Sequence, residues 1–227
     1  LSPNPNISDN ITTVTTGTGA FNDFVIGLDS NTTYYARAYA TNSNGIAYGN
    51  QVTFTSKGLV SIGDFYQGGK VFYILQGGDK DYVPGEQHGL IALPFDYYAT
   101  VPWSNCTQGL NNLSTSFYIG EGDTNTSAIV NQCSTNNPPF AALIAQNSTS
   151  YNYSDWFLPS QKAMREMMWN RISAGLTLTG TYWTSSKNSS NIYYIWPTTS
   201  PGGSASFSEG YTSSPMSLKK IRLVRKF

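Results

Sequence analysis

The chain has 227 residues, of which 11% are charged and 14% are aromatic, and its formal net charge is zero. This balance excludes the basic surface that nucleic acid binding requires and the cationic patch that recognises a membrane surface. Its apolar runs are far shorter than the ~20 residues of a membrane-spanning helix. We therefore expect neither a nucleic acid partner nor membrane insertion.

The polar residues are mainly Asn, Ser, Thr, Tyr and Gly, which is typical of secreted β proteins. We therefore expect an exported protein, extracellular or on a bacterial cell surface. Leu1 is not an initiator Met, and neither a basic nor an apolar leader region follows it. Any export signal is thus expected to have been removed or to lie outside this sequence.

The two cysteines, Cys106 and Cys133, are an even number in a composition of extracellular type. This pattern favours a disulfide between them. In the chain-entropy model, a loop of that length would stabilise the fold by roughly 3–4 kcal/mol. The alternative is two buried free thiols.

The first segment, residues 1–57, contains strand patterns only. Residues 21–28 alternate weakly, residues 33–40 alternate with period two, and residues 47–55 form a returning strand after the turn Asn42–Gly45. The alternation places Tyr35, Arg37 and Tyr39 on one face and Tyr34, Ala36 and Ala38 on the other.

This segment contains several short motifs in order: Gly27-Leu28, residues 31–35, residues 37–42, Gly45, residues 47–49 and Phe54-Thr55. Together they resemble the C-terminal half of a fibronectin type III domain of the kind common in secreted Bacteroidetes proteins. The resemblance implies an all-β sandwich that is only partial here, because its first strands are missing from residues 1–57. Such a sandwich exposes strand edges, so other copies of the chain are expected partners at those edges.

The second segment, residues 58–227, mixes strands and helices. Strands are predicted at residues 68–75, 88–93 and 221–227, and short helices at residues 126–131 and 139–146. Ser160 is predicted to cap the best helix, whose apolar stripe has helical spacing and which ends at Gly175. That stripe consists of Met164, Met167, Met168 and Ile172.

A series of motifs runs through this segment in a fixed order. They are residues 62–64, 66–69, 71–73, 88–92, 128–133, 154–160, 182–186 and 222–225. The series resembles the DUF1566 family over about residues 59–227. The resemblance implies an α+β fold of the C-type lectin-like kind, found at the C-terminal ends of bacterial surface proteins, including glycan-binding adhesins.

The sequence departs from that family at two points. Gln161-Lys162-Ala163 follows Ser160 where members often have an acidic residue, so Ser160 is expected to cap the helix alone. The Glu-Pro-Asn and Trp-Asn-Asp calcium motifs of animal C-type lectins are absent. We therefore expect no cofactor, with calcium only weakly supported by two acidic loops that lack EF-hand spacing. These loops contain Asp79, Asp81 and Glu86, and Glu121, Asp123 and Asn125.

No pattern in the chain indicates catalysis. His88 is the only histidine, so any Ser-His-Asp or Cys-His device would have to include it, and a His-rich zinc site is impossible. Because His88 lies beside Gly89 at the start of a strand, a structural imidazole is the favoured interpretation. The sequence therefore predicts a protein that is not an enzyme.

Large side chains have two expected roles. Trp156, Trp169 and Trp183 are predicted in the core, and the family resemblance marks Trp156, Pro159, Trp183, Arg222 and Arg225 as structural anchors. Residues 187–196 and 207–212 combine aromatic and small polar side chains, a mixture suited to recognition surfaces and to sugars. The alternative is an ordinary solvent-facing strand pair. The candidate ligand-binding residues are Asn188, Asn191, Tyr193, Tyr194, Trp196, Phe207, Glu209 and Tyr211.

These observations favour a non-enzymatic, adhesin-like binding module that recognises an extracellular glycan or a surface protein. A second hypothesis is a structural subunit or tip of a surface filament, with the partial sandwich completed by a strand of a neighbour. A third is a retroelement-diversified or phage receptor-binding protein. A hydrolase is a weaker alternative.

Overall fold

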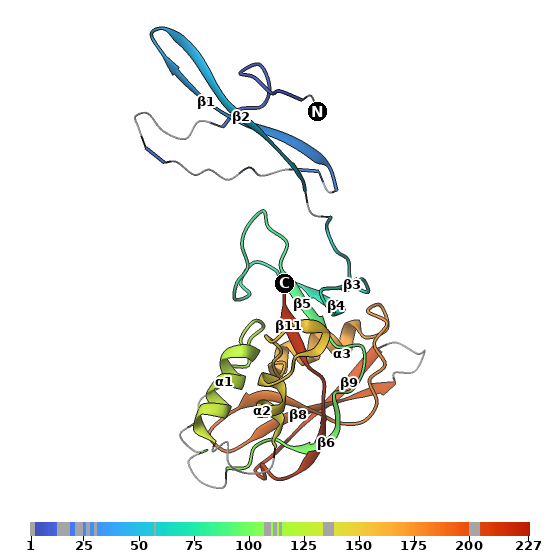
Figure 1. Ribbon diagram of the computed structural model, residues 1–227. Helices are drawn as coiled ribbons and strands as arrows, with labels where there is room; N and C mark the ends of the chain where they lie inside the picture. The colour runs from blue at the N-terminus through green and yellow to red at the C-terminus, as the bar shows by residue number, and fades with distance from the viewer. Residues whose placement is uncertain are drawn as a thin grey trace. The chain divides into compact units, whose positions relative to one another are not determined.

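The computed structural model describes residues 3–12, 19–20, 25, 28–29, 31–56, 58–106, 110, 113, 115–133, 139–199 and 205–227. The chain divides into two compact units, Leu1–Leu59 and Val60–Phe227 (Figure 1). The strand predicted for residues 21–28 falls almost entirely outside the described residues.

The first unit contains a β-hairpin. Strands β1 (Thr33–Asn42) and β2 (Gly45–Thr55) pair antiparallel, with Thr33 opposite Thr55 and Asn42 opposite Gly45. The turn tightens because Asn42 Oδ1 accepts a hydrogen bond from the Asn44 backbone at 2.8 Å, and Gly45 adopts φ +131°. The hairpin predicted from the alternation is thus confirmed.

The two faces of this hairpin differ in polarity. On one face, Tyr34 stacks on Phe54 with ring centroids 5.9 Å apart, beside the Ala36–Val52 pair. This face is open to solvent, because Val52 is 59% and Phe54 39% exposed. On the other face, the Arg37 guanidinium lies over the Tyr48 ring.

The second unit contains two sheets and all the described helices (Figure 1). The five-stranded sheet has the order β6-β10-β7-β8-β9, and the four-stranded sheet has the order β11-β5-β4-β3. Only the β10–β7 pair is parallel among the described pairs. The bounds are β3 Phe65–Tyr66, β4 Gly69–Ile74, β5 Gly89–Ala92, β6 Tyr98–Pro102, β7 Tyr182–Lys187, β8 Ile192–Thr199, β9 Ala205–Thr212, β10 Leu218–Ile221 and β11 Val224–Lys226.

The helices of this unit are short. They are α1 (Gly122–Gln132), α2 (Ala141–Gln146), the 3-10 turn η2 (Ser150–Asn152) and α3 (Gln161–Asn170). The longest described helix has 11 residues, fewer than the ~20 needed to cross a bilayer. The described chain is therefore rich in β-sheet with few helices.

A separate core lies on each face of the five-stranded sheet. Neighbouring residues of β7 point to opposite sides, so Trp183 enters a core with Trp103 and Trp156, whereas Tyr182 packs against the methionines of α3. Met164, Met167 and Met168 of α3 are fully buried, as their spacing predicted. This double burial explains why all of β7 is buried.

The start of α3 is capped by more than its first side chain. Ser160 Oγ accepts from the Ala163 backbone at 3.3 Å, as predicted. However, the backbone N–H of Gln161 donates to Ser186 Oγ, and that of Lys162 donates to the Phe117 carbonyl. Ser160 thus caps the helix without a reciprocal acidic side chain, as predicted, while β7 and the 115–120 segment accept from the other first-turn donors.

The end of α3 and one tryptophan also differ from the prediction. The helix ends at Asn170 rather than Gly175, and residues 171–175 continue as turns in which the Ala174 backbone donates to the Asn170 carbonyl and the Leu176 backbone to the Arg171 carbonyl. Gly175, with φ +62°, ends these turns. Ile172 is 63% exposed and does not join the buried methionines. Trp169 is 52% exposed and not a core residue, since it lies on the α3 face opposite the methionines.

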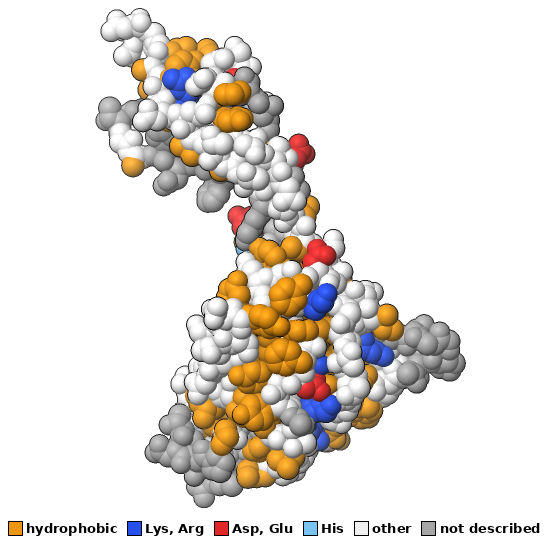
Figure 2. All heavy atoms as spheres, turned by 45° about the vertical axis from the view of Figure 1, so that its right-hand side comes forward, with side chains coloured by type: hydrophobic (Ala, Val, Ile, Leu, Met, Phe, Trp, Pro, Cys, Tyr) orange, Lys and Arg blue, Asp and Glu red, His pale blue; other side chains and the backbone are white. Residues whose placement is uncertain are grey.

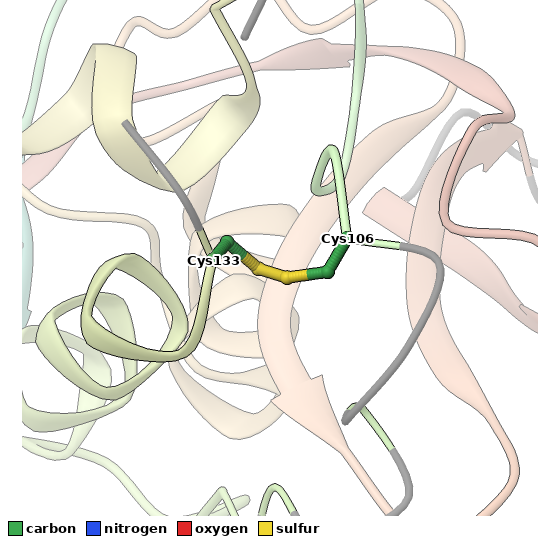
Figure 3. The surroundings of a disulfide bond; sticks show 2 residues. All are labelled: Cys106 and Cys133. Atoms are coloured by element: carbon green, nitrogen blue, oxygen red, sulfur yellow. A yellow bond between two sulfur atoms is a disulfide. The ribbon is translucent and has the colours of Figure 1, made fainter. Parts of the chain in front are cut away.

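Cys106 and Cys133 form the predicted disulfide, with their Cα atoms 5.3 Å apart (Figure 3). The bond joins the segment after β6 to the C-terminus of α1. Cys133 is 4% exposed, within the core that contains Trp183. The disulfide therefore links two distant stretches of the chain at the edge of a packed core.

Candidate functional site

The β8–β9 hairpin carries most of the candidate ligand-binding residues and divides them between two faces. Its register sets Tyr193 opposite Tyr211, Ile195 opposite Glu209, and Pro197 opposite Phe207. Residues directly opposite each other share a face, so Tyr193, Phe207, Glu209 and Tyr211 lie together on the α3 side. Tyr194 and Trp196 lie on the other side.

On the α3 side, aromatic rings in two groups lie along one row that we call the aromatic strip. Trp169 meets Phe207 edge to face at 5.0 Å, Tyr211 contacts Tyr193 at 6.3 Å, and Tyr193 contacts Phe117 at 5.1 Å. Three polar residues lie along the row between its two ends. The strip consists of Phe117, Gln161, Arg165, Trp169, Tyr193, Phe207, Glu209 and Tyr211.

The polar residues of the strip bind one another. Arg165 Nε lies 3.1 Å from Glu209 Oε1, and Gln161 Nε2 donates to Glu209 Oε2 at 3.1 Å. The Arg165 guanidinium also lies over the Phe207 ring at 5.7 Å. The three α3 residues are spaced by four, so they line one side of the helix along β9. The charges within the strip therefore balance.

The strip is open to solvent at several rings. Tyr211 is 64% exposed and Trp169 52%, and Tyr118, next to Phe117, is 65% exposed with Lys162 Nζ 4.0 Å from its ring centroid. Figure 2 shows a band of hydrophobic side chains on the second unit, interrupted by a few charged ones. Exposed aromatic clusters of this kind mark interaction surfaces.

The other face of the hairpin is more tightly packed. The Tyr194 ring lies across Gly210, where an added Cβ would come within 2.7 Å of it, and contacts buried Trp183 at 6.0 Å. Lys219 Nζ lies 3.8 Å from the Tyr194 ring centroid, and Trp196 is 5.9 Å from that ring. Tyr194 therefore packs as part of the core edge.

The two candidate asparagines lie in the β7–β8 turn. Asn188 Oδ1 accepts from the backbone N–H groups of Ser190 and Asn191, and Asn188 Nδ2 donates to the Tyr193 hydroxyl at 3.0 Å. The Asn191 carbonyl accepts from the Asn188 backbone at 3.0 Å. Asn188 shapes the turn and supports one ring of the strip.

The anchor residues lie away from the strip, in the interior. Trp156 is 2% and Trp183 0% exposed, and the Pro159 carbonyl accepts from the Ser185 backbone at 2.8 Å. Arg222, 1% exposed, donates to the Leu93 and Thr177 carbonyls. These side chains and carbonyls hold β7, β10, β11 and the 154–160 segment together.

Asp96 collects three donors next to Arg222. Lys220, Tyr182 and Arg222 donate to its carboxylate at 2.8, 2.7 and 2.6 Å. Burial alone would raise the pKa of Asp96, but these hydrogen bonds outweigh burial and hold it below its ordinary value. Burial and the bond to Asp96 raise the pKa of Tyr182 to about 12.

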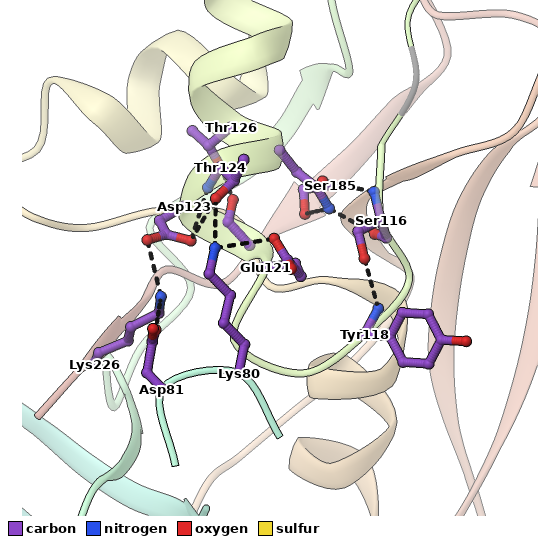
Figure 4. Close-up of polar contacts among 12 residues, drawn as sticks. Lys80, Asp81, Ser116, Tyr118, Glu121, Asp123, Thr124, Thr126, Ser185 and Lys226 are labelled. Carbon is purple, nitrogen blue, oxygen red and sulfur yellow. Dashed lines mark hydrogen bonds and ion pairs between the residues drawn. The ribbon is translucent and has the colours of Figure 1, made fainter. Parts of the chain in front are cut away.

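The two acidic loops considered for calcium are bound to lysines (Figure 4). Lys226 Nζ donates to Asp81 at 2.5 Å and to Asp123 at 2.9 Å, while Lys80 Nζ donates to Glu121 at 3.0 Å. Within the described residues, no group of three or more His, Cys, Asp or Glu side chains could hold a metal ion. The acidic side chains instead bind the first turn of α1 to neighbouring segments.

An open pocket of about 240 Å³ adjoins this lysine network. Buried Trp156 and Thr126 contribute to its lining, and Asp123, Asp155 and Lys226 are charged members of that lining. Asp155 is bound to Arg225 and Asp123 to Lys226, so the charges of the pocket are already paired.

Both ring nitrogens of His88 have neighbours within hydrogen-bonding distance. His88 Nδ1 lies 3.2 Å from the Phe227 carbonyl and Nε2 lies 2.9 Å from Glu86 Oε2, so the imidazole joins the chain end to a loop. Sequence reasoning did not identify four members of the strip, namely Phe117, Gln161, Arg165 and Trp169. The i, i+4, i+8 spacing of Gln161, Arg165 and Trp169 was the available signal.

Comparisons with known proteins concern the fold. No protein-family model matches the chain, and no curated protein matches it by sequence. The chain is similar in structure to a fimbrial protein from Bacteroides ovatus, with a TM-score of 0.52 and 14% identity. The match covers 79% of this chain and 56% of that one, so the chain spans about half the length of that protein.

Proposed function

We propose that the chain is a module of an extracellular surface filament, as a subunit or tip of a fimbria-like assembly. The observation that carries this proposal is the structural similarity to a fimbrial protein over 79% of the chain. The disulfide between Cys106 and Cys133 fits the same extracellular setting, because such bonds persist in oxidising compartments.

The β1–β2 hairpin provides a second observation that supports the proposal. One of its faces presents Tyr34, Val52 and Phe54, together with small alanines, and this face is exposed. In a β-sandwich, such a face would pack against a second sheet. In the proposed assembly, a neighbouring copy covers it and removes its apolar area from water.

The matching experiment measures association of the 227-residue chain by light scattering after size exclusion, together with negative-stain electron microscopy. We expect concentration-dependent oligomers or filaments. Val52→Lys places a charge on the exposed apolar face and should shift the population at least tenfold toward monomer. Gln51→Lys places the same charge on the opposite face of β2 and should leave assembly unchanged.

A wild-type chain that stays monodisperse and monomeric at high concentration, with a native circular dichroism spectrum, would contradict the proposal. So would equal loss of assembly in both lysine variants, because the effect would then arise from charge and not from the apolar face.

A further inference from the structure

We propose that the aromatic strip is a binding surface for neutral, extended glycans. Four of its eight residues come from the β8–β9 hairpin, three come from α3, and Phe117 comes from the segment before α1. The inference goes beyond the filament proposal, because a chain that remains monomeric can still carry this surface.

The exposed rings are held in fixed orientations. Trp169 rests against Phe207 at an interplanar angle of 78°, and Phe117 meets Tyr193 at 82°. Tyr193 in turn supports Tyr211, which is 64% exposed. Rings that are already immobilised lose little conformational entropy when a ligand stacks on them. The strip is thus preorganised for the apolar faces of sugar rings.

The polar groups among these rings retain capacity for hydroxyl groups. Glu209 accepts a hydrogen bond from Gln161 and forms an ion pair with Arg165, while a carboxylate has about four acceptor positions. The Tyr193 hydroxyl accepts from Asn188 Nδ2, so its own proton remains available as a donor. Donors and acceptors therefore alternate with apolar rings, which is the pattern that a sugar chain presents.

The charge balance argues for an uncharged ligand. Arg165 and Glu209 neutralise each other, and Lys162 and Glu166 are the charged side chains of α3 beside them. A polyanion would gain no net attraction from such a surface, since complementary charge is what favours charged partners. The strip consequently fits neutral polysaccharides better than acidic ones.

The dimensions argue for an extended ligand. Phe207 and Tyr211 are four strand positions apart, or roughly 13 Å at ~3.3 Å per residue. Gln161 and Trp169 span about 12 Å along α3. The strip is therefore long enough to contact several sugar units of one chain, rather than to enclose a single sugar. Short oligosaccharides should bind more weakly than long chains.

Another occupant would be a protein strand added to β9, which is the edge strand of the five-stranded sheet. Strand addition depends on backbone hydrogen bonds, so it should tolerate loss of the Trp169 ring. Sugar stacking depends on the ring itself. Substitution of Trp169 therefore separates the two partners.

The test is affinity electrophoresis of the 227-residue chain in gels containing mannan, dextran, xylan or, as the anionic probe, polygalacturonate. We expect at least one neutral polysaccharide to retard the protein. Trp169→Ala and Tyr211→Ala should each raise its Kd about tenfold, while Trp169→Phe should restore much of the binding. A stacking contact of about 1.4 kcal/mol corresponds to that factor.

Tyr98→Ala is the matched control. Tyr98 is 48% exposed and lies on β6, the opposite edge strand of the same sheet. Equal retardation of wild type, Trp169→Ala and Tyr211→Ala would overturn the inference, as would retardation by polygalacturonate alone or by none of the polysaccharides. If no neutral polysaccharide retards the protein, and a protein partner binds wild type and Trp169→Ala equally well, the β9 edge is instead a site of strand addition. Retardation of a purely monomeric chain would support the glycan surface and count against the filament.

Discussion

Arg225 donates two hydrogen bonds to the carboxylate of Asp155, from Nε at 2.7 Å and from Nη2 at 2.8 Å. The two residues are 70 positions apart, and the pair fastens β11 to the segment that leads into α3. The Arg225 guanidinium also lies 3.9 Å from the Tyr153 ring centroid. Its side chain is 8% exposed and that of Asp155 is 55% exposed.

Asp155→Asn should lower the free energy of unfolding by about 1–2 kcal/mol. A buried guanidinium then loses its anionic partner, although the exposure of Asp155 limits the loss. Urea denaturation followed by tryptophan fluorescence measures the change. Glu86→Gln removes the partner of His88 at an exposed pair and should cost less than about 0.5 kcal/mol. Indistinguishable midpoints for these two variants would refute the structural role of Asp155.

Removal of the disulfide should cost about 3–4 kcal/mol, because the bond closes a loop between positions 27 apart. The double variant Cys106→Ser and Cys133→Ser therefore should unfold at lower urea concentration than wild type. Reductant should lower the wild-type midpoint toward that of the variant and leave the variant unchanged. A wild-type midpoint that reductant does not move would contradict this expectation.

Gly122→Ala should destabilise the protein by about 2 kcal/mol, even though Ala favours helices by up to ~1 kcal/mol over Gly. Gly122 is the first residue of α1, and an added Cβ would lie 2.5 Å from the Leu158 carbonyl oxygen and 2.7 Å from the Phe157 ring. Overpacking of this kind displaces backbone. Thermal unfolding provides the measurement.

Gly77→Ala is its control, since the nearest atom to an added Cβ there, on Tyr82, is 3.9 Å away. This substitution should change stability by no more than about 0.5 kcal/mol. If Gly122→Ala were as stable as Gly77→Ala, the close packing of α1 on the 157–158 segment would be wrong.

Asp96→Asn should destabilise the protein near neutral pH and much less in acid. The carboxyl has a lowered pKa in the folded state, so its contribution is complete above the ordinary value of 3.8 and is lost as the pH falls through the folded value. Urea unfolding from about pH 6 down to about pH 2 should show wild type and variant converging. Asp9→Asn is the control, because it makes the same charge change in the first unit. A gap between wild type and Asp96→Asn that stays constant over this range would exclude the linkage.

Local patterns predicted much of the secondary structure. The period-two alternation of residues 33–40 gave β1, and the spacing of Met164, Met167 and Met168 gave the buried side of α3. These features depend on near neighbours in the sequence, so a short window contains the information. The fibronectin type III and DUF1566 resemblances remain predictions, since the comparisons support a β-rich fold similar to a fimbrial protein.

The candidate site was predicted only in part. Tyr193, Phe207, Glu209 and Tyr211 share a surface, but Tyr194 and Trp196 lie on the opposite face. Strand periodicity separates neighbours within one strand, but the pairing of β8 with β9 decides which residues of the two strands meet. Trp169 joined the strip because α3 packs along β9, a contact between distant segments.

The sequence by itself determined the hairpin of the first unit, the methionine face of α3 and the two cysteines that pair, since each depends on spacing or composition. Only the tertiary structure decided that α1 begins at Gly122, that α3 ends at Asn170 and that Trp169 is exposed. Each of these outcomes depends on segments far away in the chain, since α1 packs closely on the 157–158 segment and α3 packs along β8 and β9. Long-range packing supplies hydrogen-bond partners and buries side chains, and local sequence patterns do not contain this information.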